Sequence, residues 1–216
     1  MALMKQAVIP EFFARLKKAM PEPETELEYD NVYQLLVAVV LSAQATDVGV
    51  NRATTPLFKT IKTPAQMVAL GEKKLIGHIK TIGLFRMKAK NVIALSRLLI
   101  ERHGGEVPHT HEELQALPGV GRKTANVVMN VAFGEATIAV DTHIFRVGNR
   151  TGLAPGKNPL QVELKLLKRV PEEYRLHAHH WLILHGRYTC KARKPECPTC
   201  PVVQFCRYKA KTDLLG

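Results

Sequence analysis

The chain has 216 residues, enough for one large domain or two small ones. Its 31 Lys and Arg residues against 19 Asp and Glu residues give a formal net charge of +12, which favours a polyanionic partner, either nucleic acid or an anionic surface. No apolar run approaches the roughly 18 residues of a membrane span, and the N-terminus lacks a signal-peptide core. We therefore expect a cytoplasmic protein that enters no membrane and whose four cysteines form no disulfides.

Helix signals recur along the chain, whereas the alternation typical of strands is almost absent. The pattern predicts a first helix over residues 10–20 and a second over 31–41, the latter capped by Asp30 or Asn31. The valines of the second segment would also suit a strand, but the Ser-Ala-Gln-Ala that follows favours a helix. Further helices are expected to begin near Thr46 and Thr63 and to cover about 72–80, 87–103, 110–117, 124–133, 141–150, 158–170 and 173–188. Together they predict an all-α fold.

A glycine-rich turn, Leu117-Pro118-Gly119-Val120-Gly121, joins two of these helices. So tight a turn leaves backbone N–H groups exposed at a helix N-terminus, where they can hold a phosphate. Lys123 follows in the first turn of the second helix, where the helix dipole disfavours an ammonium and favours the neutral, nucleophilic amine. Taken alone, the pattern more often marks a structural turn with a solvated lysine.

The four cysteines all lie near the C-terminus and follow the spacing C-x6-C-x2-C-x5-C. Four thiolates so close together in a reducing compartment predict one metal centre, and chemistry alone leaves zinc and an iron–sulfur cluster open. Four histidines precede them, but their spacing spreads them around a helix, so we do not expect them to bind metal. The cysteines are Cys190, Cys197, Cys200 and Cys206; the histidines are His177, His179, His180 and His185.

Three basic residues, Lys191, Arg193 and Lys194, stand between the first two cysteines. A basic loop fixed by a metal centre can contact a phosphate backbone. The alternative is a solvated charged surface with no ligand.

These motifs resemble those of the endonuclease III family, DNA glycosylases of the helix-hairpin-helix superfamily that carry a 4Fe-4S cluster. The resemblance follows the family's order over most of the chain. Besides the four cysteines, it rests on the segments 41–47, 79–84, 117–128, 140–146 and 180–188.

The resemblance implies a two-lobed fold with a DNA-binding cleft between the lobes. One lobe would be a six-helix barrel over residues 25–135 that contains the hairpin. The other would join residues 1–24 to 136–216 and hold the 4Fe-4S cluster on the four cysteines. A monomer in the bacterial cytoplasm, associated with the nucleoid, is implied as well.

The implied activity is excision of oxidised pyrimidines from double-stranded DNA, followed by cleavage of the abasic site by β-elimination. The family's nucleophilic lysine maps onto Lys123, which would form a Schiff base with the sugar, and its catalytic aspartate maps onto Asp141. From the residues alone Asp141 is as readily the N-cap of a helix, and both roles are compatible.

Further DNA contacts come from the same resemblance, because a base that leaves the duplex must be replaced in the stack. Gln44 and the Ile82-Gly83-Leu84 loop would fill the space, with Leu84 as the wedge; otherwise Gln44 would be a surface amide and Leu84 a core residue. One departure is Phe85, where tyrosine is common in the family. The remaining expected DNA contacts are Gly119, Val120, Gly121, Arg122 and His143.

Two other functions compete with this one. A mismatch glycosylase of the adenine-removing type shares the fold, but normally lacks a lysine at the position of Lys123 and carries a further C-terminal domain, whereas this chain ends soon after Cys206. A non-enzymatic DNA-binding module with a zinc centre would explain the charge but not the combination of Lys123 with Asp141.

Overall fold

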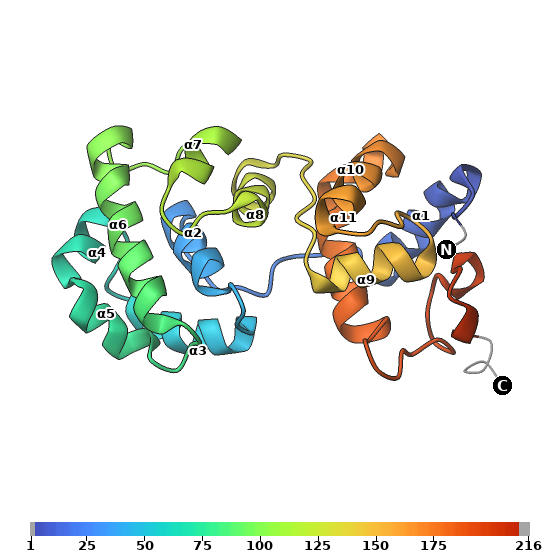
Figure 1. Ribbon diagram of the computed structural model, residues 1–216, viewed down its shortest axis with the longest axis horizontal. Helices are drawn as coiled ribbons and strands as arrows, with labels where there is room; N and C mark the ends of the chain where they lie inside the picture. The colour runs from blue at the N-terminus through green and yellow to red at the C-terminus, as the bar shows by residue number, and fades with distance from the viewer. Residues whose placement is uncertain (1–2, 212–216) are drawn as a thin grey trace. The chain divides into compact units, whose positions relative to one another are not determined.

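The computed structural model describes residues 3–211, which form eleven α-helices with a few 3-10 and π-helical turns and contain no strand (Figure 1). The predicted all-α fold is thereby confirmed. The chain divides into a unit Thr25–Gly134 and a second unit made of the described residues on either side of it. Each unit has its own apolar core. The lobes and cleft that the resemblance implied stay a prediction.

The unit Thr25–Gly134 contains seven α-helices, one more than the six that the resemblance implied. The seven agree with the separate helices that the sequence signals predict over this range, and Gly71, with φ +78°, ends one short helix and starts the next. The helices are α2 (Val32–Leu41), α3 (Asp47–Phe58), α4 (Pro64–Leu70), α5 (Glu72–Ile79), α6 (Phe85–His103), α7 (His111–Ala116) and α8 (Arg122–Phe133).

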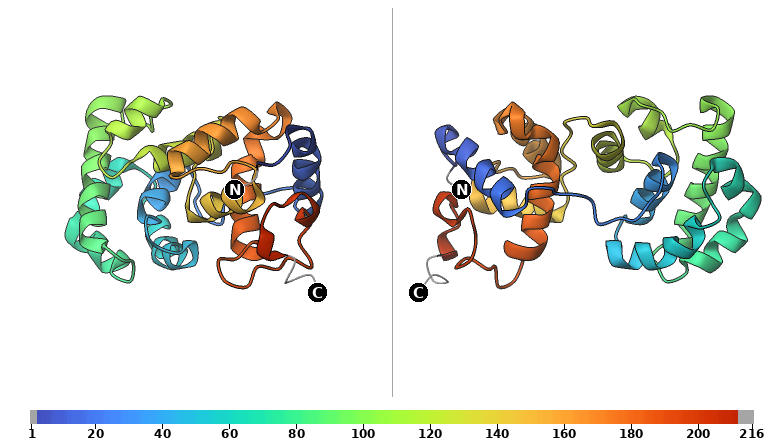
Figure 2. Two further views of the ribbon diagram at one scale, coloured as in Figure 1. Left: turned by 45° about the vertical axis from the view of Figure 1, so that its right-hand side comes forward. Right: turned by 180° about the vertical axis from the view of Figure 1, so that it is seen from behind.

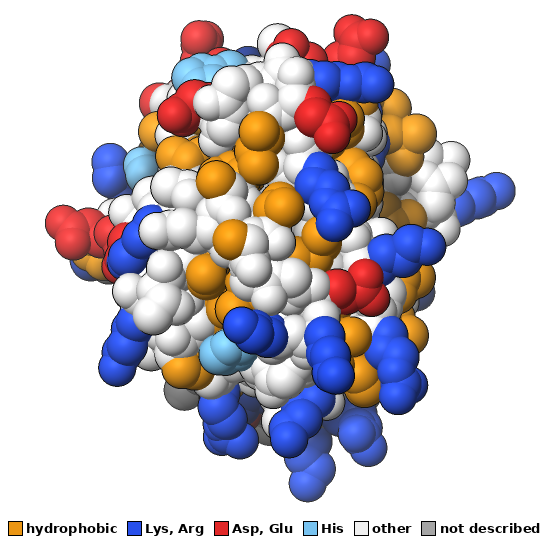
Figure 3. Space-filling model, turned by 90° about the vertical axis from the view of Figure 1, so that its left-hand side faces the viewer, with side chains coloured by type: hydrophobic (Ala, Val, Ile, Leu, Met, Phe, Trp, Pro, Cys, Tyr) orange, Lys and Arg blue, Asp and Glu red, His pale blue; other side chains and the backbone are white. Residues whose placement is uncertain are grey.

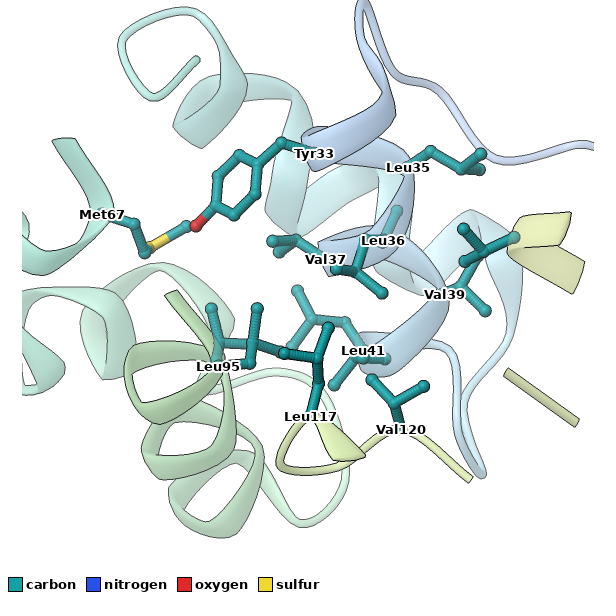
Figure 4. Close-up of a cluster of buried hydrophobic side chains, with 14 of the residues drawn as sticks. Tyr33, Leu35, Leu36, Val37, Val39, Leu41, Met67, Leu95, Leu117 and Val120 are labelled. Carbon is teal, nitrogen blue, oxygen red and sulfur yellow. The ribbon is translucent and has the colours of Figure 1, made fainter. Parts of the chain in front are cut away.

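Helix α2 is the centre of this unit and packs against α3, α6 and α8. All its residues except the first are buried, so its continuous apolar run reflects burial on every side rather than a strand (Figure 4). Asn31 caps it by accepting a hydrogen bond from the backbone N–H of Gln34, at 2.9 Å. The buried amide of Gln34 in turn donates to the carbonyl oxygens of Phe58 and Ile61, which fixes the end of α3.

The caps predicted from the sequence are present at the other helices as well. Thr46, Thr63 and Asn158 each accept a hydrogen bond from the backbone N–H of the third residue of their helices. Thr110 also caps its helix, but the carboxylate of Glu113 accepts from the Thr110 hydroxyl at 2.6 Å instead of closing the expected box on the backbone. Local side-chain chemistry therefore sets most helix starts.

The second unit consists of α1 (Ile9–Ala19), α9 (Thr142–Thr151), α10 (Pro159–Arg169) and α11 (Glu172–Leu184) (Figure 2). Helix α1 packs on α11, and the Trp181 indole N–H donates to the Met20 carbonyl oxygen at 2.8 Å, which ties the two together. The last helix had been expected to run to residue 188. It ends at Leu184 and continues as a π-helical turn, His185–Thr189, closed by a bond from the Cys190 N–H to the His185 carbonyl.

No helix in the described part of the chain has the length and apolar character needed to cross a membrane.

Candidate active site and metal centre

The hairpin between α7 and α8 is anchored in the core of its unit by two apolar side chains. Leu117 and Val120 point into the same core as Leu41 and Leu95 (Figure 4) and are only 2% and 5% exposed. Gly119 between them has φ +80°, and a Cβ there would lie 3.0 Å from Asn91 on α6. Both the backbone conformation and the neighbouring helix therefore require glycine at position 119.

Gly121, the N-cap of α8, has a different environment. Its φ is −91°, it is exposed, and an added Cβ would have no atom within 4 Å. Neither backbone strain nor packing requires a glycine there. No side chain caps α8, whose first helical bond runs from the Ala125 N–H to the Gly121 carbonyl. The first turn of α8 thus presents its backbone donors beside a residue without a side chain, as a closely approaching phosphate needs.

Lys123 is the second residue of α8 and is exposed, as its neighbour Arg122 is. Its amine is thus open to a ligand that binds at the start of the helix. Lys123 belongs to the unit Thr25–Gly134, whereas Asp141 belongs to the other unit.

Asp141 caps α9, as one of the two sequence interpretations held. Its Oδ1 accepts from the Ile144 N–H at 2.8 Å, which leaves Oδ2 outside the cap. Two residues on, the His143 Nδ1 lies 3.2 Å from a guanidinium nitrogen of Arg146. Because arginine can only donate, Nδ1 is the acceptor and the ring proton is on Nε2, where it can serve as a donor to a ligand.

Two neighbouring loops of the unit Thr25–Gly134 carry Gln44 and Leu84. Both residues have left-handed backbones, with φ of 54° and 59°, and both are exposed. A Cβ on Gly83 would lie 3.9 Å from the Gln44 carbonyl oxygen, so the loops are adjacent. Leu84 is 52% exposed, and the alternative that it is a core residue is wrong. Ile82, expected among the DNA contacts, is instead buried beneath the loop at 4% exposure.

Basic side chains occur on the two helices that flank the second of these loops. Figure 3 views the molecule from the side of α4, α5 and α6 and shows Lys and Arg gathered on one half of that face, with most Asp and Glu on the other. Phe85 begins α6, and the guanidinium of Arg86 lies 5.0 Å from the centre of its ring. The exposed basic residues of α5, its C-cap and the first half of α6 are Lys73, Lys74, Lys80, Arg86 and Lys90.

The four cysteines are free thiols that line one pocket, as the spacing predicted for a common metal centre. Burial raises the pKa of Cys200 to about 11 and raises the pKa of Cys206 and of Cys197 above the usual value. The apoprotein therefore holds these groups as neutral thiols near pH 7, and a bound metal has to displace their protons.

His185 lies against the same pocket, a position that spacing around a helix did not reveal. Its Nε2 is 3.8 Å from the sulfur of Cys200, and burial lowers its pKa to about 4, so the ring is neutral near pH 7. The turn that carries it requires a glycine, because a Cβ on Gly186 would come within 2.8 Å of the Cβ of His143. The turn His185–Thr189 thus contacts both α9 and the cysteine pocket.

Two arginines of α9 hold the backbone around the first cysteine, and the sequence interpretation gave neither of them a role. Arg146 donates to the carbonyl oxygens of Cys190 and Gly186, at 2.8 and 2.7 Å. Arg150 donates to those of Lys191 and Ala192, at 2.6 and 2.8 Å. Their i, i+4 spacing on a helix was the available signal, because it places both guanidinium groups on one side of α9.

The basic loop that follows is exposed at each of its three cationic residues. The Lys191 ammonium forms an ion pair with the Glu196 carboxylate at 2.9 Å, and so solvated a pair stabilises little and can open to a phosphate. Lys194 has a left-handed backbone, with φ of 53°. Arg193 lies between these two residues.

Comparison with protein families matches residues 37–172 to the HhH-GPD superfamily base excision DNA repair proteins, a match to more than half of the chain. The hairpin and α9 with Asp141 fall inside this range. Fold and site thus define a base excision DNA repair protein of this superfamily.

Within that superfamily the chain belongs to the endonuclease III family. It is 57% identical to Endonuclease III of Escherichia coli K12 over 211 residues, 98% of this chain and 100% of the relative. Against Endonuclease III of Haemophilus influenzae Rd the identity is 58%, over 94% and 96% of the two chains. The family expected from the motifs is confirmed.

Solved structures agree with this assignment. The structure of a trapped endonuclease III–DNA covalent intermediate, an estranged-adenine complex, matches with a TM-score of 0.91 and 42% identity over 99% of this chain and 100% of that one. A thermostable thymine-DNA glycosylase, with a TM-score of 0.83 and 24% identity over 95% and 97% of the two chains, shares the fold.

Proposed function

We propose that this protein removes oxidised pyrimidines from double-stranded DNA and cleaves the resulting abasic site, with Lys123 as the nucleophile. As a member of the endonuclease III family it is a base excision repair glycosylase with abasic-site lyase activity. The observation that supports Lys123 most directly is its place: an exposed amine in the first turn of α8, next to a hairpin whose backbone donors can hold the DNA strand.

The chemistry needs an amine and a carboxylate. The neutral amine of Lys123 attacks C1′ of the sugar as the damaged base departs with the bonding electrons. The sugar ring then opens as the C1′–O4′ bond breaks and O4′ takes the proton released by the amine, which leaves an imine at C1′. The imine makes the C2′ proton acidic, and removal of that proton expels the 3′ phosphate by β-elimination. Asp141, whose Oδ2 is outside the helix cap, would accept a proton from the amine or stabilise the cationic sugar.

The damaged nucleotide must leave the stack before C1′ becomes accessible. Leu84 and Gln44 are exposed on adjacent loops, and we assign to them the filling of the space left in the duplex. The lysines and arginines around the second loop would hold the flanking phosphates. The backbone donors at Gly121, the Nε2–H of His143 and the exposed side chains of Lys191, Arg193 and Lys194 would add further contacts.

We also propose that the cysteine pocket holds a 4Fe-4S cluster. The four sulfur ligands such a cluster takes line one pocket. The choice of this cluster over a zinc ion rests on membership of the endonuclease III family, for which the resemblance implied a 4Fe-4S cluster. When bound, the cluster would link the four cysteines and hold the loop of Lys191, Arg193 and Lys194 in place. The protein would act as a monomer on the bacterial chromosome in the cytoplasm.

Borohydride reduction tests the role of Lys123, because it converts an imine between protein and sugar into a stable bond. We expect the intact protein to give a covalent adduct with a duplex that contains thymine glycol, and Lys123→Ala to give none. Lys168→Ala, which removes an exposed lysine of α10, is the control and should give as much adduct as the intact protein. An undiminished adduct from Lys123→Ala would exclude Lys123 as the nucleophile.

Asp141→Asn adds a second arm to this experiment. Asparagine caps a helix about as well as aspartate, so the thermal midpoint should stay near that of the intact protein. Loss of the carboxylate should slow excision by about 10²- to 10⁴-fold, the range of general acid–base catalysis. Unchanged excision would mean that Asp141 is only a cap.

A further inference from the structure

Lys88 is the only lysine in residues 3–211 that is buried, with 3% of its surface exposed. It lies in the first turn of α6, and its backbone N–H donates to the Leu84 carbonyl oxygen at 3.0 Å. Its side-chain ammonium donates to the carbonyl oxygen of Leu41, the last residue of α2, at 2.9 Å. Lys88 is thus bonded at one end to Leu84 and at the other to the helix that leads into the Gln44 loop.

A buried charge at this place is costly for the fold. An ammonium loses its hydration on burial, and burial lowers the pKa of Lys88 below its usual value. The C-terminal carbonyl groups of α2 and the negative end of its dipole compensate for part of that cost. Methionine would fill a similar volume without the penalty, and replacing buried charges by apolar groups is often neutral or stabilising. Packing alone therefore does not explain a lysine at position 88.

The two loops that Lys88 connects are both strained. Gln44 and Leu84 are two of the three non-glycine residues with positive φ in the described chain. Such conformations persist only where the surroundings hold them in place. The backbones of the loops approach each other at Gly83 and the Gln44 carbonyl. A shift at the end of α2 would therefore move both exposed side chains.

We propose that Lys88 is a positioning residue that holds the Gln44 and Leu84 loops together for entry into DNA. The assignment depends on the function proposed above for Gln44 and Leu84. Lys88 does not touch DNA in this scheme; its ammonium fixes the end of α2 relative to the start of α6. Its loss should impair steps that need a filled duplex and spare steps that do not.

Lys88→Met is the variant that separates these steps. On a duplex with a damaged pyrimidine we expect single-turnover excision to slow by about 10- to 100-fold, the range that a small misplacement of positioning groups produces. On a single-stranded oligonucleotide with one abasic site, where no stack has to be refilled, borohydride trapping should stay within about twofold. Arg97→Met removes an exposed basic residue from the second half of the same helix and should change neither. Equal losses on both substrates would show a general structural role and overturn the proposal.

A double-mutant cycle with Leu84→Ala gives an independent readout. If Lys88 acts through the loops, Lys88→Met should slow duplex excision by less than about twofold in the Leu84→Ala background. Independent, additive losses would overturn the proposal. If Gln44→Ala and Leu84→Ala both leave duplex excision unchanged, the proposed function of the two loops in filling the duplex is wrong. If those two variants slow duplex excision and Lys88→Met does not, the function of the loops stands and only the positioning role of Lys88 is wrong.

The thermal midpoint, followed by circular dichroism, establishes whether Lys88→Met is folded at the assay temperature. If it is not, Lys88→Gln replaces it, because an amide is neutral, less costly to bury than an ammonium and too short to reach the Leu41 carbonyl in the same way. The expected pattern is the same: a loss on the duplex and none on the single strand. A loss on neither substrate from folded Lys88→Gln would overturn the proposal.

Discussion

At the scale of single residues, the two glycines of the hairpin are glycines for different reasons. Gly119 needs its left-handed backbone and the space beside Asn91 on α6. Gly121 needs neither, since its backbone is ordinary and the space around it is open. One glycine is therefore part of the fold. The other would, in the proposed function, keep the start of α8 clear for a ligand.

Alanine substitutions should separate the two reasons. Gly119→Ala should lower the free energy of unfolding by about 1–3 kcal/mol, the cost of a left-handed non-glycine residue. Gly121→Ala should lower it by less than about 1 kcal/mol, as for an N-cap change, yet weaken binding to a duplex with an abasic site. Urea unfolding and a DNA-binding titration measure both effects. Unweakened binding by Gly121→Ala would show that no ligand group approaches this residue closely.

At the scale of elements, α9 has two roles. Asp141 caps it, and its arginine side chains hold the backbone around the first cysteine. The guanidinium groups of Arg146 and Arg150 hold four backbone carbonyl groups between Gly186 and Ala192. Arg150 also lies 4.7 Å from the ring centre of Tyr208, beyond the last cysteine. The same helix thus carries the proposed catalytic carboxylate and the support of the basic loop.

Arg150→Lys should loosen that loop without changing the charge. A lysine ammonium cannot reproduce the two hydrogen bonds that the planar guanidinium group donates to the Lys191 and Ala192 carbonyl oxygens. A hydrogen bond from a charged donor contributes about 1.5–3 kcal/mol, so losing one should increase transient opening about tenfold or more. Limited trypsin digestion measures this directly, since trypsin cleaves after Lys191 and Arg193. Arg97→Lys, an exposed change on α6, is the control. Equal cleavage rates for both variants would contradict a supporting role for Arg150.

At the scale of the whole molecule, each unit has a separate core and a separate part of the proposed chemistry. Thr25–Gly134 contains the hairpin, Lys123 and the two exposed loops. The other unit contains Asp141, the arginines of α9 and the cysteine pocket. The proposed reaction would therefore use residues from both units, each of which has its own apolar core.

Metal analysis tests the proposed cluster in the intact protein. Purified without oxygen, the protein should be coloured and contain about four iron atoms per chain, the content of one 4Fe-4S cluster. Cys200→Ser should lose most of that iron, because the other three thiols cannot complete the ligand set. A colourless protein with about one zinc ion per chain would refute the cluster. A fully loaded Cys200→Ser variant would exclude Cys200 as a ligand.

The sequence by itself determined the helical class, most helix starts, the common cysteine pocket and the family. These features depend on neighbours within a few residues: a cap and its N–H groups, two glycines in one turn, four cysteines in one short segment. The predictions from the sequence were wrong where the outcome depends on contacts between residues far apart in the chain. The helix predicted over residues 173–188 ends at Leu184, where a π-helical turn beside α9 begins.

Only the tertiary structure decided what each exposed or buried side chain can do. The sequence left Leu84 open between core and surface and gave no role to Arg150 or Lys88. The ammonium of Lys88 meets a carbonyl group 47 positions away, and Arg150 meets the basic loop 41 positions away. Contacts over such separations arise from the packing of whole helices, which no local pattern specifies.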